Sequence, residues 1–383
     1  GMWMETESKA EGVRRGRASV ALRALNGLRL CTGDMEVMDT YMQDRFYVVQ
    51  LVMWGLRGVS RVILANNPLS GALIMAALCW ESCWKALLGA LGLLASTLTA
   101  VVMGQDSGEV SGGFHGFNGM LVSLLMGQLS SAGDWYWWLL LPACMGSASS
   151  VFLYSALSSV FKRWDLPVSV FPFNTVIMLY LLCTGPDNPY FPHHTAMPPG
   201  APEPNGTKLI AIEVIRGIPL GVGQIYTCGA LGPSLLILAA VLLYSPLLTV
   251  HALLGSAVGT LAGLSVAVNH HFLYSGLSGF NGSLGCMAVG GLFFTFSWRI
   301  HLLSIASVSL SPILHVWYIS LFLQVGLPAS SWASTLLSTL MLLLTGSLAT
   351  YRIPTGQVMA PEHNLCSHSQ WEAGNPAATD IQL

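Results

Sequence analysis

Long apolar blocks constrain the fold of this chain more than any other feature of its sequence. Three of them occupy residues 85–104, 136–161 and 235–264. A helix needs roughly 20 predominantly apolar residues to cross a hydrocarbon layer about 30 Å thick, so each block is long enough to span it. In lipid only helices and closed barrels pair all their backbone polar groups, and the sequence lacks the alternating segments of roughly ten residues that mark a barrel. The blocks therefore predict an all-α membrane protein.

The composition agrees with this class. Hydrophobic residues make up 53% of the chain and charged residues 9%, whereas soluble domains carry about 25% charged residues. A net charge of −2 without a basic stripe gives no indication of nucleic-acid binding. The eight cysteines are scattered singly, mostly in apolar segments, which indicates small buried side chains rather than disulfides or a metal site.

The apolar segments fall into two groups. We expect ten transmembrane helices in two inverted repeats of five, each repeat with a half-spanning pore helix. The expected order is a loose cytoplasmic arm at 1–45, a first membrane repeat at 46–183, a Pro-rich extracellular loop at 184–208, a second membrane repeat at 209–347 and a cytoplasmic tail at 348–383. The spans are expected near 69–83, 84–104, 114–130, 135–161, 166–183, 233–244, 246–267, 275–292, 299–322 and 327–347.

An even number of spans puts both termini on one side of the membrane. The arm at 1–45 is basic, and basic segments next to membrane spans stay in the cytoplasm. The same orientation places Lys162 and Arg163 inside and the sequon at Asn205 outside, where it can be glycosylated. We therefore expect a multi-pass plasma-membrane protein with cytoplasmic termini and a glycan on Asn205.

Short motifs occur twice in the same order at nearly constant spacing, which indicates an internal duplication. The pairs are Leu-Arg-Gly at 56–58 with Ile-Arg-Gly at 215–217, Asn-Pro-Leu-Ser at 67–70 with the weaker Gly-Pro-Ser at 232–234, Gly-Phe-Asn-Gly at 116–119 and 279–282, and Leu-Pro at 166–167 and 327–328. Each half has an odd number of expected spans, so the second half should be inverted relative to the first. Inverted repeats place a solute path at the midplane, where the halves meet.

Each half begins with an amphipathic stretch, at 46–65 and at 209–228. Such a stretch either enters the membrane part-way, with the carbonyls of its end directed toward a pore, or lies flat on the membrane surface. Its occurrence in both halves favours the pore helix. Gln224, among glycines in the second stretch, either offers its amide to a small polar solute or bonds a neighbouring helix. The residues alone leave both roles of Gln224 open.

Two aromatic–aliphatic pairs stand in the repeated Gly-Phe-Asn-Gly segments. Phe117 and Leu121 are four residues apart, as are Phe280 and Leu284, so each pair lies on one helix face. If the pairs faced each other, they would form a flat apolar slit that passes a planar molecule and rejects hydrated ions. Ordinary helix packing explains the same spacing and is the more common cause of it.

The chain lacks the common catalytic motifs. It contains no H-E-x-x-H, no G-x-S-x-G, no P-loop and no Gly-rich dinucleotide motif, and its ten histidines show no zinc-ligand spacing. We therefore expect no enzyme activity, no cofactor and no metal. Acidic residues within the spans are nearly absent, Glu213 being the main candidate, whereas ion-coupled carriers keep ionisable residues at the midplane. This scarcity favours passive conduction of a neutral solute.

Several longer motifs, taken in combination, resemble the urea transporter family. They are Leu-Arg-Gly at 56–58, Asn-Asn-Pro-Leu-Ser-Gly at 66–71, Trp-Trp-Leu-Leu-Leu-Pro at 137–142, Trp-Asp-Leu-Pro-Val at 164–168, Phe-Pro-Phe-Asn at 171–174, Ile-Pro-Leu-Gly-Val-Gly-Gln-Ile-Tyr at 218–226, Gly-Phe-Asn at 279–281 and Val-Gly-Leu-Pro-Ala at 325–329. The resemblance implies a homotrimer with one pore in each protomer. It also implies two half-spanning helices with ladders of carbonyl oxygens, and a polar constriction between two aromatic slots.

The resemblance assigns roles to eight residues. Gln224 resembles the ladder side chain of the second half, and Ser331 stands where the family has a pore threonine. The residues that match the slots are Phe117, Leu121, Phe280 and Leu284. Two positions depart from the family pattern, because Arg61 stands where the first half usually has Gln and Val170 where it usually has Thr. Arginine only donates hydrogen bonds and valine lacks a hydroxyl, so both changes alter the first half of the path.

Together these features predict a passive channel that conducts urea down its gradient, as a homotrimer with urea and membrane lipid as partners. Two alternatives stay open, namely the same fold retuned to another small neutral solute such as water or ammonia, and a non-conducting membrane scaffold. Arg57 and Arg216 occur at matching positions of the two halves. We expect them to anchor helix ends rather than to line the path.

Overall fold

The structure is a computed structural model that describes residues 2–195, 197–204, 207–295, 297–307, 309–310 and 330–365. Several sequence predictions fall partly or wholly outside these ranges. Among them are the glycan site at Asn205, the Leu-Pro pair at 327–328, parts of the two spans expected near 299–322 and 327–347, and the end of the tail expected at 348–383.

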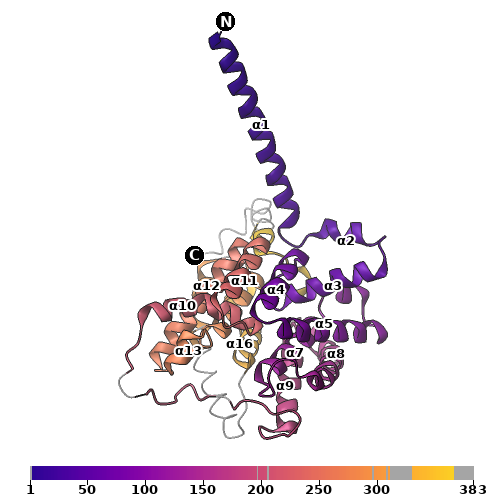
Figure 1. Ribbon diagram of the computed structural model, residues 1–383, viewed down its shortest axis with the longest axis vertical. Helices are drawn as coiled ribbons and strands as arrows, with labels where there is room; N and C mark the ends of the chain where they lie inside the picture. The colour runs from indigo at the N-terminus through magenta and orange to yellow at the C-terminus, as the bar shows by residue number, and fades with distance from the viewer. Residues whose placement is uncertain are drawn as a thin grey trace.

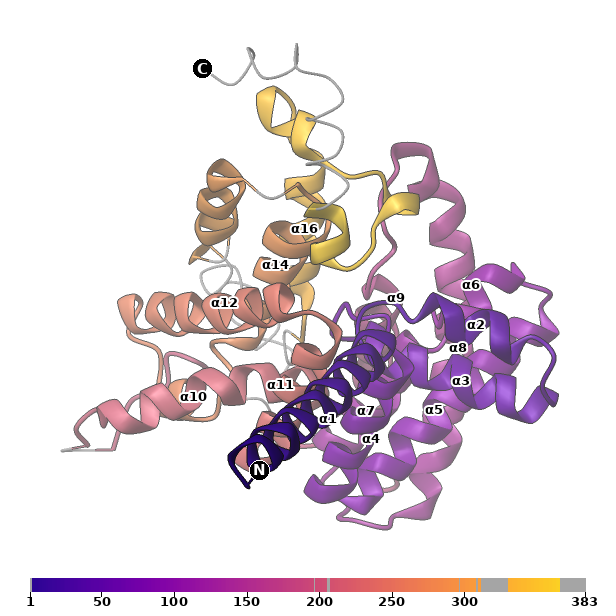
Figure 2. The same cartoon turned by 90° about the horizontal axis from the view of Figure 1, so that it is seen from above.

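The described residues form helices joined by loops, with two isolated β-bridges. The first part contains α1 (Met2–Cys31), α2 (Glu36–Met42), α3 (Tyr47–Arg61), α4 (Pro68–Glu81), α5 (Cys83–Val102), α6 (Ser107–Ser111), α7 (Phe117–Leu129), η1 (Trp137–Leu139), α8 (Leu140–Phe161), η2 (Lys162–Trp164) and α9 (Phe171–Thr184). The second part contains α10 (Ala211–Gly223), η3 (Gln224–Tyr226), α11 (Leu231–Tyr244), α12 (Pro246–Ser265), α13 (His270–Tyr274), α14 (Phe280–Cys286), η4 (Met287–Leu292), a helical stretch at 298–307, α16 (Trp332–Leu342), η5 (Ser347–Tyr351) and η6 (Thr355–Gln357). The two parts lie side by side (Figure 2).

Three described helices are long and apolar enough to cross a membrane, namely α5, the run Trp137–Trp164 and α12. A fourth span results if α11 is counted with the preceding run Ala211–Tyr226, from which it is bent by 75°. Four further apolar helices are shorter, and these are α4, α7, α9 and α16. The expectation of an all-α membrane protein is therefore confirmed.

The N-terminal arm is helical, whereas the sequence predicted a loose segment. Helix α1 projects far from the rest of the molecule (Figure 1). Its sequence is rich in Ala, Leu, Arg and Glu, which have high helix propensity, and this favours a helix in a segment that projects from the body. The end of the arm is attached to the body, because the Asn67 Nδ2 atom donates to the carbonyls of Cys31 and Gly33, each at 2.9 Å.

Arg57 anchors this attachment from inside the protein. Its side chain is buried and donates to the carbonyl of Asp34 at 2.8 Å, to the carboxylate of Asp39 at 3.1 Å and to the Oδ1 atom of Asn66 at 2.9 Å. Arg216, at the matching position of the second half, is half exposed and lies 3.6 Å from Glu213 on the same helix. Neither arginine lines the cavity described below. Among the described residues, Arg57 therefore joins distant segments of the chain, whereas Arg216 pairs within its own helix.

Caps set the start of helices α4 and α12. Asn67 precedes α4, and its Oδ1 atom accepts hydrogen bonds from the backbone N–H groups of Leu69 and Ser70 at 2.9 and 3.0 Å. Ser245 precedes α12, and its Oγ atom accepts from the Leu248 N–H at 3.0 Å. Both helices begin with proline, which suits the first helical position because its missing N–H group would have no partner there.

The repeated motifs coincide with repeated backbone geometry. Several turns of the first half contain a residue with positive φ that has a counterpart 161 or 163 residues later. Among these pairs are Leu64 (61°) with Thr227 (61°), Gly113 (78°) with Gly276 (83°), and Ser169 (54°) with Ser330 (51°). Side chains other than glycine rarely adopt this conformation, so its recurrence at the same spacing indicates the same local fold in both halves.

Close helix contacts hold α7 and α14 in place. A Cβ atom at Gly92 in α5 would lie 2.5 Å from the carbonyl oxygen of Gly119 in α7. A Cβ atom at Gly255 in α12 would lie 2.4 Å from the carbonyl oxygen of Gly282 in α14. Glycine is needed at both positions because the backbones of packed membrane helices approach closely there. The two contacts fix the helices that carry Phe117 and Phe280.

Candidate solute path

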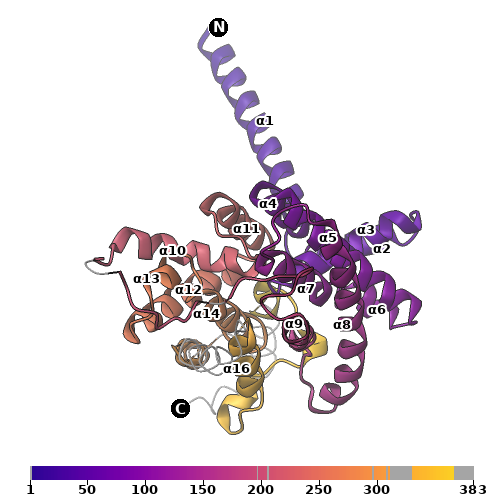
Figure 3. The same ribbon diagram turned by 60° about the horizontal axis from the view of Figure 1, so that its bottom comes forward.

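A cavity of about 1060 Å³ lies inside the molecule, and residues of both halves line it. All eight residues that the sequence singled out line it, and these are Arg61, Phe117, Leu121, Val170, Gln224, Phe280, Leu284 and Ser331. They come from α3, α7 and α9 of the first half, from η3, α14 and α16 of the second half, and from the turns next to these helices. Helices α9 and α16 lie next to each other where the halves meet (Figure 3).

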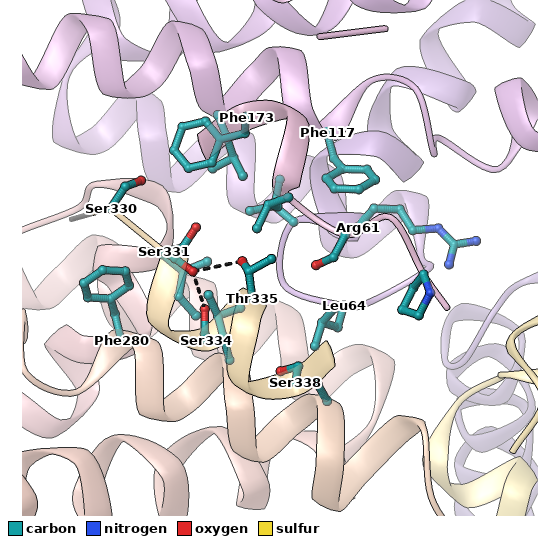
Figure 4. Close-up of a pocket in the computed structure, with 18 of the residues that line it drawn as sticks. Arg61, Leu64, Phe117, Phe173, Phe280, Ser330, Ser331, Ser334, Thr335 and Ser338 are labelled. Atoms are coloured by element: carbon teal, nitrogen blue, oxygen red, sulfur yellow. Dashed lines mark hydrogen bonds between the residues drawn. The ribbon is translucent and has the colours of Figure 1, made fainter. Parts of the chain in front are cut away.

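The aromatic–aliphatic pairs both reach this cavity. Phe117 and Leu121 are each 7% exposed on α7, and the Phe117 ring packs edge-on against Tyr154 with 6.3 Å between centroids. Phe280 and Leu284 occupy the corresponding face of α14. In Figure 4 the rings of Phe117 and Phe280 flank a central group of hydroxyl side chains. The pairs thus line a common space and do not serve helix packing alone.

Gln224 offers a hydrogen-bond acceptor to the cavity. It stands just after α10, and its Nε2 atom donates to the backbone carbonyl of Ser275 at 2.9 Å. This bond fixes the side-chain amide and leaves the Oε1 atom available to accept. The glycines before Gln224 allow the end of α10 to approach its neighbours, since a Cβ atom at Gly221 would lie 2.2 Å from the Ser256 Oγ atom.

Arg61 makes the matching bond in the first half. Its Nε atom donates to the backbone carbonyl of Gly112 at 2.9 Å, and Gly112 precedes Ser275 by the same spacing that separates Arg61 from Gln224. The rest of the side chain differs, because the guanidinium carbon lies 4.0 Å from the centroid of the Phe114 ring. Figure 4 shows the guanidinium directed away from Ser331 and Ser334. The contact with Phe114 is a cation–π interaction that offsets part of the cost of placing this charge in the cavity.

Val170 and Ser331 occupy equivalent positions. Each residue immediately precedes a helix, α9 and α16 respectively, and their φ angles are −103° and −100°. Ser331 brings a hydroxyl to the cavity, whereas Val170 brings two methyl groups. The backbone geometry is thus repeated and only the side-chain chemistry differs.

Asn174 joins the two halves at the centre, a role that the sequence analysis did not assign. Its Oδ1 atom accepts hydrogen bonds from the backbone N–H and the hydroxyl of Ser331, both at 3.2 Å. Its Nδ2 atom donates to the Thr335 hydroxyl at 3.4 Å. Asn174 is fully buried in α9, and both partners belong to the α16 region. Its position 161 residues before Thr335 was the only sequence signal for this contact.

Asn118 and Asn281 brace the turns before α9 and α16. The Asn118 Nδ2 atom donates to the carbonyl of Ser169 at 3.1 Å, and its Oδ1 atom accepts from the Phe173 N–H at 3.0 Å. Asn281 bonds the carbonyl of Ser330 at 3.3 Å and the N–H of Ser334 at 3.2 Å in the same way. These bonds position the central residues, and neither asparagine lines the cavity.

Charged side chains line one end of the cavity. Asp34 lies there and accepts from the Tyr244 hydroxyl at 3.1 Å and from the Ala360 N–H at 3.1 Å. Glu109 pairs with Lys162 at 2.7 Å. Both carboxylates are thus bonded to protein groups.

Part of the expected C-terminal tail also lines this end of the cavity. The residues that reach it are Thr355, Gly356, Val358 and Met359. Thr355 bonds the Asp165 carboxylate through its N–H at 3.2 Å, and Glu362 accepts from the Ser245 hydroxyl at 2.8 Å. The segment between them therefore connects the first half to the second, whereas the sequence predicted only a tail.

An all-helical membrane protein with a partly polar cavity between two similarly built halves has the organisation of a membrane transport protein. A family model described as urea transporter matches residues 52–346. The chain is 41% identical to Urea transporter 1 of Rattus norvegicus over 342 residues, which is 89% of each chain. It is 40% identical to Urea transporter 1 of Ovis aries over 345 residues, 89% of this chain and 90% of the relative. It is likewise 40% identical to Urea transporter 1 of Mus musculus over 335 residues, 87% of each.

The chain belongs to the urea transporter family. The resemblance read from its motifs is therefore confirmed. Because this is a family of transporters, the expectation that the protein is not an enzyme is confirmed as well.

Proposed function

We propose that this protein conducts urea passively across a membrane, and that the cavity between its halves is the path. Family membership supports urea as the solute. The observation that carries the path is the convergence of all eight predicted residues, from distant parts of the chain, on one cavity.

The path has one polar centre between two apolar pairs. A urea molecule that leaves water must replace hydrogen bonds to its four N–H groups and its carbonyl oxygen. Leaving one such group without a partner costs about 1–3 kcal/mol. Gln224 accepts from an N–H group through its Oε1 atom, and Ser331 contributes a hydroxyl oxygen at the centre. Phe117 with Leu121, and Phe280 with Leu284, hold the planar solute edge-on and give hydrated ions nothing in exchange for their water shells.

The first half of the path binds urea more weakly than the second. Arg61 takes the place of the acceptor that Gln224 provides, and it can only donate. Its guanidinium stacks on Phe114 and points away from the central hydroxyl groups, which leaves the path open to the solute. Val170 adds no polar group at the position equivalent to Ser331. Urea therefore meets its tightest polar site in the second half.

We also propose that the chain forms ten spans in two inverted repeats, with α3 and α10 as half-spanning helices. Paired turns with positive φ, and the paired bonds of Arg61 and Gln224, support equivalent halves. The 75° bend after the run Ala211–Tyr226 suits a helix that enters part-way and turns back. Inverted halves would meet at the membrane midplane, where interrupted helices line transport paths.

Family membership also suggests an oligomeric state and a cellular location for this protein. We propose a homotrimer in the plasma membrane with both termini in the cytoplasm and a glycan on Asn205. Exposed apolar side chains on α8 and α12, among them Leu141, Phe152, Val250 and Leu261, provide surface for lipid or for neighbouring protomers. Cross-linking in native membranes, read by mass, tests the trimer, and a dimer or monomer as the largest species would refute it.

Stopped-flow light scattering on proteoliposomes tests the function itself. Liposomes that contain the protein should equilibrate urea far faster than empty liposomes. The rate should not change when a sodium or proton gradient of either direction is imposed, since the carboxylates at the cavity are bonded to protein groups. Urea flux equal to that of empty liposomes would refute conduction, and flux that follows an ion gradient would refute the passive mechanism.

A further inference from the structure

Helix α16 brings a row of hydroxyl groups to the cavity. The residues of this row are Ser331, Ser334, Thr335, Ser338 and Thr339, and all of them line the cavity. They recur at three- and four-residue intervals, so they share one face of the helix. Figure 4 shows Ser331, Ser334, Thr335 and Ser338 on the side of the cavity opposite Phe117 and Phe173.

The first half has no comparable row. The positions of α9 that correspond to the row are Val170, Phe173, Asn174, Ile177 and Met178. Only Asn174 among them is polar, and it does not line the cavity. The row is therefore a property of one half of this chain and is not produced by the duplication.

Four hydroxyl groups of the row use their hydrogen atom within the protein. Ser334 and Thr335 donate to the carbonyl of Ser331 at 3.0 and 2.9 Å, and Thr339 donates to the carbonyl of Thr335 at 2.8 Å. Ser331 donates to the Asn174 Oδ1 atom at 3.2 Å. A hydroxyl oxygen has two lone pairs, so after this donation it faces the cavity as an acceptor only.

We propose that this row is an acceptor track along which an N–H-rich neutral solute passes between the centre and one end of the path. The proposal rests on urea conduction as the function and adds the feature that selects for N–H groups. A solute with four N–H donors gains more from a row of acceptors than a planar solute of similar size with two. The row thus favours urea over acetamide, in which a methyl group replaces one amino group.

The test removes acceptors without touching the bonds of Asn174. The double variant Ser334→Ala/Thr339→Val deletes two hydroxyl groups of the row, while Ser331 and Thr335, which bond Asn174, stay unchanged. Each lost acceptor should lower urea flux by roughly 2- to 10-fold, which is the range for a net hydrogen bond. Acetamide flux should fall by less, so that the ratio of urea to acetamide flux decreases at least about threefold.

A matched control is Thr99→Val in α5. The Thr99 hydroxyl donates to the Ala95 carbonyl at 2.7 Å, as Thr339 does to Thr335, but Thr99 does not line the cavity. This variant should leave both fluxes unchanged. The second control, Thr339→Ser, keeps the hydroxyl and should keep the parent flux ratio. All proteins are compared as proteoliposomes with equal amounts of folded protein, measured by size-exclusion chromatography.

The outcomes separate the two proposals. A parent protein that conducts urea, together with a double variant of unchanged flux ratio, overturns the acceptor track and leaves the proposed function intact. Equal loss of urea and acetamide flux also overturns the track, because it indicates a change of pore shape. A parent without urea flux overturns the proposed function and the track with it.

Discussion

The unequal halves of the path make a quantitative prediction for Gln224. Its Nε2 atom is held by the Ser275 carbonyl at 2.9 Å, so its Oε1 atom is the group that faces the solute. The substitution Gln224→Ala removes this acceptor. If one urea N–H group then passes the barrier without a partner, the barrier rises by about 1–3 kcal/mol. At about 1.4 kcal/mol per factor of ten in rate, urea flux falls roughly 5- to 150-fold.

Val170→Ala provides the contrast in the first half, at the position equivalent to Ser331. It removes methyl groups and no hydrogen-bonding atom. Urea flux should therefore change by less than about twofold, which is less than the change expected from the loss of one hydrogen bond. The double variant Arg61→Gln/Val170→Thr supplies an acceptor and a hydroxyl to the first half. It should raise urea flux above that of the parent, because the solute then finds partners on both sides of the centre.

The assay is stopped-flow urea flux in proteoliposomes at matched protein content, with water permeability as a control for general pore damage. Flux from Gln224→Ala that equals flux from Val170→Ala would refute the assignment of the stronger site to the second half. Equal flux in the parent and all three variants would show that these positions do not line the path.

Three further predictions concern ion coupling, the glycan and the buried arginine. Urea flux should be the same with and without a sodium or proton gradient, and a strong dependence would contradict a channel. Asn205→Gln produced in a eukaryotic cell should no longer shift on gels after deglycosylation, whereas a remaining shift would place the glycan elsewhere. Arg57→Gln should lower the free energy of unfolding by about 2–4 kcal/mol because several bonds of a buried charge are lost, and Arg216→Gln by less than about 1 kcal/mol because its ion pair is exposed. Thermal melting in detergent compares the two, and equal shifts would refute the anchor role of Arg57.

The sequence by itself determined the class, the family and eight residues that line the cavity. Apolar blocks as long as those at 136–161 and 235–264 indicate a membrane protein rather than a soluble fold, because helices of this length match the hydrocarbon core of a bilayer. The spacing of the repeated motifs located the two halves. The same spacing separates equivalent turns with positive φ, such as those at Leu64 and Thr227. These features are local in the chain, so a pattern of neighbouring residues is enough to reveal them.

Only the tertiary structure decided what each residue of the path contacts. Arg61 could have turned to a carboxylate or a carbonyl, and it bonds the Gly112 carbonyl while stacking on Phe114. Asn174 reaches Ser331, which is 157 residues away, and Thr355 reaches Asp165 across 190 residues. Hydrogen bonds depend on distances of about 3 Å between atoms, and such distances are set only when the helices pack. The same packing brings a run of serines and threonines on α16 to the lining of the cavity. It also brings part of the expected tail there.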